Sequence, residues 1–400
     1  QEAAARDREL KSGQLRGPLH GIPVGIKDII DVQGLPTLAG SPLRERVPAE
    51  HDATVVQRLR EAGAVILGKT ATTQWAAFDP PPTRNPWNLE HTPGGSSSGS
   101  AAAVAVGMCL ASLGSQTGGS ISRPASYCGV AGCKPTFGRV SRTGVVPVSF
   151  HLDHVGPIAH NAHDLAFILQ AIAGPDASDP WCARRDAPDV INQIDHVAPP
   201  RLGILGEFFH EHADPEVRDS ISNTVEKLQS AGAQTVDASL PSDFDTFTAH
   251  HLLVMEVEAA EYHRDRFPAQ REHFGPAIAQ LLEEGNKADA RDYAAALNHR
   301  RSFTRDLIEM LGQFDALLCP STTTPAPTPE TTGDPRFNSP WSYAGLPTVT
   351  IPCQLSSAGL PLGIQLIGPP WSEAQLLSVA AWGESKIGFN RTPSMVAHGS

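Results

Sequence analysis

Short apolar runs alternate with amphipathic helical patterns through the first half of the chain. Residues 21–30 form an apolar, β-branched run, whereas residues 52–64 carry apolar positions at helical spacing and predict an amphipathic helix capped by Asp52. Further strand-like runs cover residues 110–115 and 150–159, and another helical pattern follows them. This alternation predicts an α/β fold in which helices cover both faces of a β-sheet.

The second half of the chain carries more helix and one irregular segment. Helical patterns cover residues 214–231 and about 243–312, and the second pattern is interrupted near Pro268 and Gly285. Residues 321–341 are rich in proline and threonine and cannot pack as a regular element. A segment of this kind inside a compact domain is typical of a functional loop, so we expect it to lie ordered over a site.

Strand-like runs recur near the end of the chain, within residues 347–368, and a helical pattern follows them. Strands at both ends predict one sheet with a helical insertion rather than a series of separate domains. We therefore expect a single domain over residues 1–400. Its expected parts are a core at about 17–175, the helical insertion at about 243–312, and C-terminal strands and a helix at 313–385 that complete the same sheet.

The composition argues against several classes of partner. The 400 residues include 31 basic and 43 acidic side chains, for a net charge of −12, and no basic cluster is visible. We therefore expect neither nucleic acid nor a membrane as a partner. No apolar run approaches the roughly 18 residues of a membrane span, and we expect no signal peptide. The six cysteines are scattered without a C-x-x-C pair, which indicates reduced thiols and a cytoplasmic protein.

Residues 92–105, TPGGSSSGSAAAVA, form the first segment with candidate chemistry. Their G-x-S-x-G match centred on Ser97 is the pattern of a nucleophile elbow, but the preceding RNPWNLEHTP is poor strand material. Gly94 and Gly99 have the spacing of a phosphate-binding P-loop, but Ser100 stands where that loop needs a lysine. Neither motif is therefore the favoured explanation of this serine cluster.

A second cluster of small residues lies within residues 112–129. The sequence TGGS at residues 117–120 sits between a strand-like run and a helical segment. Consecutive glycines let backbone N–H groups converge beside a serine, as an oxyanion hole next to a nucleophile requires. A tight strand-to-helix turn, with glycines for close packing, explains the same residues equally well.

Lys27 lies inside an otherwise apolar run, and lysine is rarely buried without a reason. Burial lowers the pKa of a lysine, so that its neutral amine can act as a base. When this segment is taken alone, a surface lysine or one paired with the adjacent Asp28 is the simpler interpretation.

Together, three segments resemble the motifs of the amidase signature family. They are GIPVGIKD at residues 21–28, GGSSSGSAAAVA at residues 94–105 and GSQTGGSI at residues 114–121, in the family's order and spacing. Residues 128–147, 153–165 and 359–368 are also similar to this family, so the resemblance covers most of the chain. It implies the amidase signature fold, a large mixed central β-sheet covered by helices on both faces, and the cleavage of amide C–N bonds.

The resemblance also implies a Ser-cisSer-Lys triad in place of Ser-His-Asp. Ser120 maps onto the nucleophile, Ser96 onto the serine that transfers protons, and Lys27 onto the base. The Gly95–Ser96 peptide bond is then expected to be cis, and Ser97 to form hydrogen bonds behind the reacting groups. The backbone N–H groups expected to stabilise the oxyanion belong to Thr117, Gly118, Gly119 and Ser120.

Two positions depart from the family's usual motif. Gln116 stands where an aspartate is common, and the arginine usually found two residues after the nucleophile is replaced by Ser122, with Arg123 one step later. With the segment TGDPRFN at residues 332–338, these changes are most similar to malonamidase-type members. There an arginine holds a substrate carboxylate, so Arg123 is the candidate for that role, and pairing with a structural acid explains it equally well. Gln116 and Arg139 are the further candidates for substrate contact.

We therefore expect an amidohydrolase that cleaves a small linear amide, such as the carboxylate-bearing malonamate, through a seryl acyl-enzyme to a carboxylate and ammonia or an amine. The same triad also suits aryl amides, carbamates (urethanes) or short amide oligomers. A third candidate is the glutaminase (A) subunit of a tRNA-dependent amidotransferase. The expected partner is a small-molecule amide, no metal or other cofactor is expected, and a homodimer is the candidate assembly.

Overall fold

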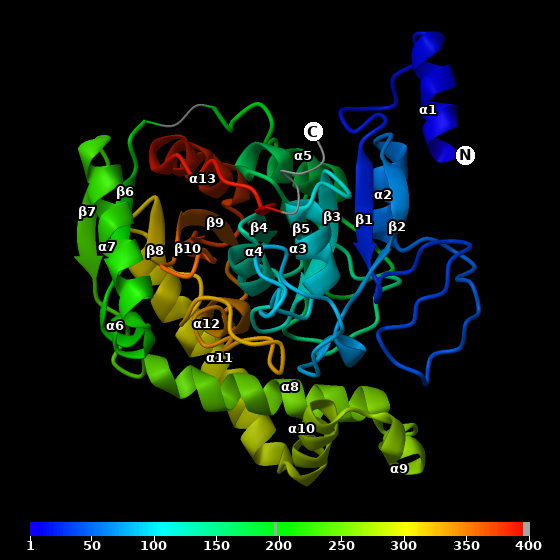
Figure 1. Cartoon of the computed structure of the whole chain (residues 1–400). Coiled ribbons are helices and arrows are strands. Elements are labelled where there is room, and N and C mark those ends of the chain that lie inside the picture. The colour runs from blue at the N-terminus through cyan, green and yellow to red at the C-terminus, as the bar shows by residue number, and fades with distance from the viewer. Residues whose placement is uncertain (196–197, 395–400) are drawn as a thin grey trace.

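The computed structural model describes residues 1–195 and 198–394, which form ten strands in one sheet and thirteen α-helices (Figure 1). The order of the strands across the sheet is β2-β1-β3-β5-β4-β9-β10-β8-β6-β7. Their bounds are β1 Pro23–Lys27, β2 Val65–Thr70, β3 Ala111–Gln116, β4 Ala131–Lys134, β5 His154–Ala159, β6 Arg201–Leu205, β7 Gln234–Ala238, β8 Ala316–Pro320, β9 Thr348–Leu355 and β10 Pro361–Ile367.

The helices surround this sheet. Their bounds are α1 Glu2–Lys11, α2 Thr54–Glu61, α3 Ser98–Ala105, α4 Ser122–Cys128, α5 Ala162–Ile172, α6 Glu207–His212, α7 Pro215–Ser230, α8 Phe247–His263, α9 Phe267–Gln270, α10 Pro276–Lys287, α11 Ala290–Leu311, α12 Ser339–Tyr343 and α13 Glu373–Ile387. Three 3₁₀ turns are also present in the described chain, η1 Gln74–Ala76, η2 Phe244–Thr246 and η3 Arg271–His273. None of the helices in this part of the chain combines the length and apolar character needed to cross a membrane.

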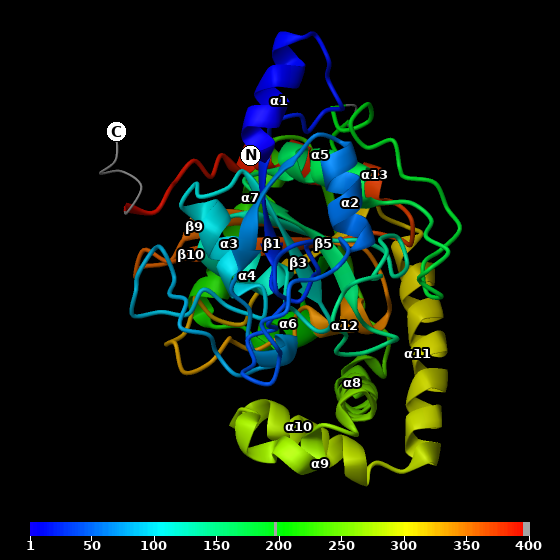
Figure 2. The ribbon, with the colours of Figure 1, turned by 90° about the vertical axis from the view of Figure 1, so that its right-hand side faces the viewer.

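The sheet is mixed. β1 pairs in parallel with β2 and β3 near one edge, and β6 pairs in parallel with β7 and β8 near the other. The pairs between these two ends, through β5, β4, β9 and β10, are antiparallel. Helices α2, α5 and α13 pack on one another over one face, whereas α3 and α4 lie over the other (Figure 2). The prediction of an α/β fold with a large mixed sheet covered on both faces is confirmed.

The predicted cap of the second helix is wrong. α2 begins at Thr54, its N-cap is Ala53, and no side chain caps it. The carboxylate of Asp52 instead accepts the N–H of Gln33 at 2.8 Å and pairs with Arg60 at 2.8 Å. Asp52 therefore links the preceding loop to α2 and does not cap this helix. The local sequence pattern does not reveal these two partners of Asp52.

The helices between β7 and β8 form a layer beyond one end of the sheet. α8 packs against α10 and α11, and α11 returns the chain to the sheet (Figure 2). The arrowhead of β1 points towards α8 in both views (Figures 1 and 2). These helices, which correspond to the predicted insertion, therefore face the end of β1 that carries Lys27.

Candidate active site

Lys27 is the last residue of β1, and its side chain is completely buried. Its Nζ atom lies 2.6 Å from Ser96 Oγ and 2.8 Å from Ser115 Oγ. Ser115 belongs to β3, and parallel neighbours such as β1 and β3 place their carboxyl ends at the same edge of a sheet. Asp28 forms its ion pair with Lys69, at 2.9 Å. Lys27 is therefore a buried lysine held by two hydroxyl groups, not a surface residue paired with its neighbour.

The environment of Lys27 favours its neutral form. Burial holds the pKa of Lys27 well below its usual range, and the carboxylate of Asp153 acts in the opposite direction without reversing the shift. Both hydrogen-bond partners of the amine are neutral hydroxyl groups. A neutral amine has a lone pair that accepts a proton, so Lys27 can act as a general base.

Ser96 and Ser97 lie in the buried loop before α3, and the Gly95–Ser96 peptide bond is cis. Ser97 Oγ accepts the N–H of Ser115 at 3.2 Å and donates to the carbonyl of the same residue at 3.3 Å. The N–H of Ser97 donates to the carbonyl of Ser120 at 3.3 Å. Ser97 thus joins its loop to β3 and to the Ser120 loop. Its completely buried side chain shows that the G-x-S-x-G match has a structural explanation.

Ser120 lies on the loop between β3 and α4 and faces a cavity together with residues 117–119. A Cβ atom added to Gly119 would lie 2.5 Å from Asn338 Oδ1, so close packing explains this glycine. The same glycine leaves the backbone N–H groups of the loop unobstructed. The contact between Ser97 and Ser120 brings this loop beside Ser96. The three residues of the implied triad therefore come from three segments that meet where β1 and β3 end.

The cavity in front of Ser120 has a volume of about 460 Å³. Its apolar wall comes mainly from α6, α8 and α10 and includes Phe208, Phe247, Leu252, Met255 and Leu281. Polar and charged side chains also line it, among them Glu211, His212, Asp245, His251, Asp334 and Arg336. The Pro- and Thr-rich segment therefore contributes residues to the cavity, as we expect for a loop over a site. The helices between β7 and β8 supply much of its apolar wall.

A model of the amidase family matches residues 1–377. The chain belongs to the amidase family. It is an amidase-family hydrolase that acts on C–N bonds.

Named relatives place this amidase-family chain among proteins with different substrates. A glutamyl-tRNA(Gln) amidotransferase subunit of Geobacter metallireducens is 37% identical over 97% of this chain and 89% of its own length. A putative amidase, AmiD, of Mycobacterium tuberculosis is 36% identical over 97% of this chain and 85% of its own length. The structure of the native peptide amidase of Stenotrophomonas maltophilia matches with a TM-score of 0.83 and 32% identity, over 98% of this chain and 88% of that one. The names of these relatives therefore do not point to one substrate.

Arg123 of this family member is buried against the cavity, with 2% of its surface exposed. Its Nη2 donates to the carbonyl of Gly95 at 2.8 Å and to Thr332 Oγ1 at 3.3 Å. Its Nε and Nη1 have no hydrogen-bond partner among the described residues. Burial lowers the pKa of this guanidinium, opposed by Tyr127 and Asp334. The Arg123 guanidinium therefore has two unused nitrogen donors beside the loop that carries Ser120.

Gln116, a candidate for substrate contact, lies at the carboxyl end of β3. Its side chain is completely buried and does not line the cavity. Its Oε1 accepts the N–H groups of Ile121 and Ser122, at 2.8 and 2.9 Å, and its Nε2 donates to Ser342 Oγ at 3.0 Å. These bonds hold the turn between Ser120 and α4. Gln116 therefore shapes the loop that carries Ser120 from outside the cavity.

Arg139 also lies away from the cavity. Its Nη2 pairs with Glu373 Oε2 at 3.1 Å, its Nη1 donates to the carbonyl of Asp186 at 3.0 Å, and its guanidinium lies over the ring of Trp371. All of these partners are distant in sequence, so the motif that contains Arg139 does not reveal them. The guanidinium of Arg139 is therefore committed to α13 and its surroundings, and the structure places it outside the cavity.

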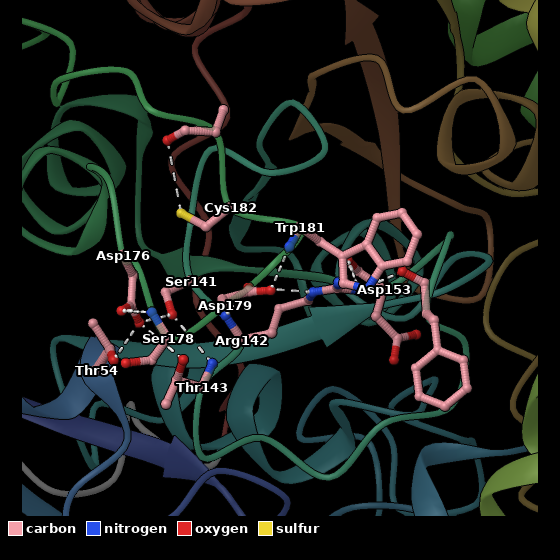
Figure 3. A network of polar contacts seen from close by, with 12 residues as sticks. Thr54, Ser141, Arg142, Thr143, Asp153, Asp176, Ser178, Asp179, Trp181 and Cys182 are labelled. Carbon is pink, nitrogen blue, oxygen red and sulfur yellow. Dashed lines mark hydrogen bonds and ion pairs between the residues drawn. The ribbon is translucent and has the colours of Figure 1, made fainter.

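A polar network behind the site fixes the loop that carries Asp153 (Figure 3). Arg142 pairs with Asp179 at 3.6 Å, and its Nη1 donates to the carbonyls of Phe150 and Asp153 at 2.9 and 3.4 Å. The carboxylate of Asp153 accepts a hydrogen bond from the Thr117 hydroxyl group at 2.6 Å. The network therefore extends to the first residue of the loop that carries Ser120.

We predict that Asp176, at the other end of this network, contributes strongly to stability (Figure 3). Its carboxylate accepts hydrogen bonds from the hydroxyl groups of Thr54, Ser141 and Thr143 and from the N–H of Ser178, at 2.7, 2.6, 2.9 and 2.9 Å. Asp176→Ala should lower the free energy of unfolding, measured by urea denaturation, by about 2–3 kcal/mol, because four donors lose a charged acceptor. Asp219→Ala, at an exposed position on α7, is the control and should change it by less than about 0.5 kcal/mol. Equal losses in both variants would contradict this assignment.

The residues of α6 and α8 that line the cavity belong to no motif recognised in the sequence. His251 is the clearest case, since it is buried, lines the cavity and bonds through Nε2 to the carbonyl of Thr117 at 3.1 Å. It is one of sixteen histidines in the chain, and no local motif surrounds it. Only the packing of the insertion against the loop reveals its position.

Proposed function

We propose that this chain hydrolyses small linear amides through an acyl-enzyme on Ser120, with Lys27 as the base and Ser96 as the proton carrier. The observation that carries the proposal is the placement of Lys27, which is completely buried and lies 2.6 Å from Ser96 Oγ. Burying a charged amine without a counter-ion is costly. A neutral lysine beside a serine, with a second serine lining the adjacent cavity, is the arrangement that a seryl hydrolase with a lysine base requires.

In the first half-reaction the Ser120 oxygen forms a bond to the amide carbonyl carbon. The Ser120 proton passes to Ser96, and the proton of Ser96 passes to the neutral amine of Lys27. As the tetrahedral adduct collapses, the C–N bond breaks, and Ser96 donates a proton to the leaving nitrogen and recovers one from Lys27. This step yields an ester on Ser120 together with ammonia or an amine.

In the second half-reaction the oxygen of a water molecule forms a bond to the ester carbonyl carbon. One water proton passes through Ser96 to Lys27, and a proton returns by the same route to the Ser120 oxygen as the ester bond breaks. The product is the carboxylic acid, and the triad regains its starting state. In both half-reactions the N–H groups of residues 117–120 stabilise the negative charge that develops on the carbonyl oxygen. Loss of one such donor typically raises the activation free energy by ~3 kcal/mol.

The preferred amide in this proposal carries a carboxylate close to the scissile bond, as malonamate does. Arg123 supports this choice, because it lines the same cavity as Ser120 and retains two nitrogen atoms without partners in the described structure. Its bonded nitrogen reaches a backbone carbonyl and a hydroxyl group, neither of which neutralises its charge. A guanidinium with free donors suits a carboxylate, which can accept two parallel hydrogen bonds.

The Arg123 role predicts a change in selectivity. Arg123→Gln should lower kcat/KM for malonamate roughly 10–100-fold more than kcat/KM for 3-methylbutanamide, because only malonamate carries a charge for the guanidinium to bind. Steady-state kinetics on this isosteric pair measures the ratio. Arg139→Gln, at a buried arginine outside the cavity, is the matched control and should leave the ratio unchanged. An unchanged ratio in Arg123→Gln would reject the carboxylate role.

The apolar wall of the cavity supports a second candidate. The aromatic and aliphatic side chains of α6 and α8, with Phe208 and Phe247 among them, face a space of about 460 Å³. This volume lies within the roughly 300–1,000 Å³ of pockets that bind drug-sized molecules. Aryl amides, carbamates or short amide oligomers would use more of this space than malonamate does.

A panel of amides tests the proposal and separates its alternatives. We expect hydrolysis of malonamate with a higher kcat/KM than that of 3-methylbutanamide, phenylacetamide or glutamine. A preference for phenylacetamide would favour the second candidate, and a preference for glutamine would favour the glutaminase function suggested by the relative from Geobacter metallireducens. Failure to release ammonia from every amide in the panel would contradict the proposal as a whole.

A further inference from the structure

The carbonyl groups of residues 117–119, which precede Ser120, are each held by a hydrogen bond from a different element. The three contacts are His251 Nε2 to the Thr117 carbonyl at 3.1 Å, Ser342 Oγ to the Gly118 carbonyl at 2.6 Å, and the Arg123 N–H to the Gly119 carbonyl at 2.9 Å. Their donors belong to α8, α12 and α4, respectively. The loop is therefore fixed by side chains and backbone outside it as well as by its own sequence.

Peptide geometry links these contacts to the oxyanion hole. The peptide bonds of residues 117–120 are trans, and in a trans peptide the carbonyl and the following N–H point in opposite directions within one plane. A hydrogen bond to the Thr117 carbonyl therefore also fixes the direction of the Gly118 N–H. Glycine has no Cβ to restrict its backbone, so a loop with two consecutive glycines depends on such outside contacts to hold its N–H groups in place.

We propose that His251 is a positioning residue for the oxyanion hole, because its hydrogen bond to the Thr117 carbonyl keeps the Gly118 N–H directed at the substrate carbonyl oxygen. This inference rests on the proposed amide hydrolysis at Ser120. His251 acts through the peptide plane that it holds and takes no proton in the reaction. The contact also ties the oxyanion loop to α8, which forms the wall of the substrate cavity.

The chemistry of His251 suits this role. A carbonyl oxygen only accepts hydrogen bonds, so Nε2 carries the proton in the contact at 3.1 Å. Burial lowers the pKa of His251 to about 4, which keeps the ring neutral and in one tautomer at neutral pH. Only 5% of the surface of this residue is exposed, so water does not replace the ring as a donor. The neutral donor adds no positive charge to the cavity.

The test compares a variant without the donor with one that keeps it. In His251→Phe, which preserves a ring and removes the N–H, kcat should fall roughly 10–100-fold with little change in KM, as for a catalytic group displaced by a fraction of an ångström. Affinity for a boronic acid analogue of the substrate, which forms a tetrahedral adduct with Ser120, should fall by a similar factor. His251→Gln, whose side-chain amide donates, should recover most of both losses. His250→Phe, on the same helix and outside the cavity, is the control and should behave as the unaltered protein does.

Three outcomes would overturn the inference. One is a kcat for His251→Phe within twofold of the unaltered protein, another is a loss that His251→Gln shares in full, and the third is a loss of kcat without a loss of boronic acid affinity. His251→Met replaces the Phe variant if thermal unfolding shows that the latter does not fold. Failure of the proposed function is distinguishable, because it would appear as absence of amide hydrolysis in the unaltered protein.

Discussion

Ser120→Ala is expected to abolish amide hydrolysis, with kcat falling by roughly 10⁴–10⁶-fold, the scale found when a catalytic nucleophile is removed. Without the hydroxyl oxygen no acyl-enzyme forms, and the N–H groups of the loop are left to stabilise only a direct attack by water. Ser120 lines the substrate cavity, whereas Ser97 is completely buried behind it. Ser97→Ala should therefore keep the capacity to form an acyl-enzyme, with a smaller loss that reflects its two side-chain hydrogen bonds to the N–H and carbonyl groups of Ser115.

Two measurements check this prediction. Ammonia release from the best substrate gives the loss of rate, and mass spectrometry after treatment with a fluorophosphonate locates the labelled residue. The label should appear on Ser120 in the unaltered protein and in Ser97→Ala, and on neither Ser96 nor Ser97 in Ser120→Ala. EDTA should leave the rate unchanged, as the family resemblance implies. A label on Ser97, or more than about 1% residual activity in Ser120→Ala, would contradict a nucleophilic Ser120.

The fold class was predictable because most strands of this sheet are buried on both faces. β3 and β5 are buried at every position, and such strands appear in a sequence as continuous runs of apolar and small residues. The order of the strands was not predictable, since it depends on pairs between distant segments, such as Cys133 in β4 with Val349 in β9. No local periodicity encodes such a pairing.

The residues of the candidate site were likewise predictable only in part. Lys27, Ser96 and Ser120 are found because each lies in a motif whose small residues are required by close backbone packing, as Gly119 illustrates. Arg139 and Gln116 belong to the same motifs, but their partners, Glu373 and Ser342, lie far along the chain. A motif shows that a polar residue is needed, whereas the distant partner decides whether that residue meets the substrate or supports the loop.

Lys27→Met is expected to lower kcat by roughly 10²–10⁴-fold, the usual contribution of a general base, and to remove one limb of the pH–rate profile. Burial holds the pKa of Lys27 well below its usual range, and only the neutral amine accepts a proton. In the unaltered protein the rate should therefore fall as the pH drops through this lowered pKa, and that acid limb should be absent in Lys27→Met. Lys134 is the matched control, because it is also completely buried and burial lowers its pKa to about 7. Lys134→Met should keep the acid limb, and a limb that persists in Lys27→Met would assign the base to another group.

The same substitution should stabilise the folded protein at neutral pH. The folded-state pKa of Lys27 lies below its unfolded value of about 10.4. Between these two values the unfolded chain binds one proton more than the folded chain, so stability rises with pH across this window. Methionine removes this dependence and fills the same space. Urea unfolding at several pH values should therefore show Lys27→Met more stable than the unaltered protein near pH 7, by a margin that narrows as the pH approaches 10. A Lys27→Met variant that is less stable at every pH would contradict this expectation. It would mean that the hydrogen bonds from Lys27 to Ser96 and Ser115 stabilise the fold, and that the buried lysine does not lower stability in return for its catalytic role.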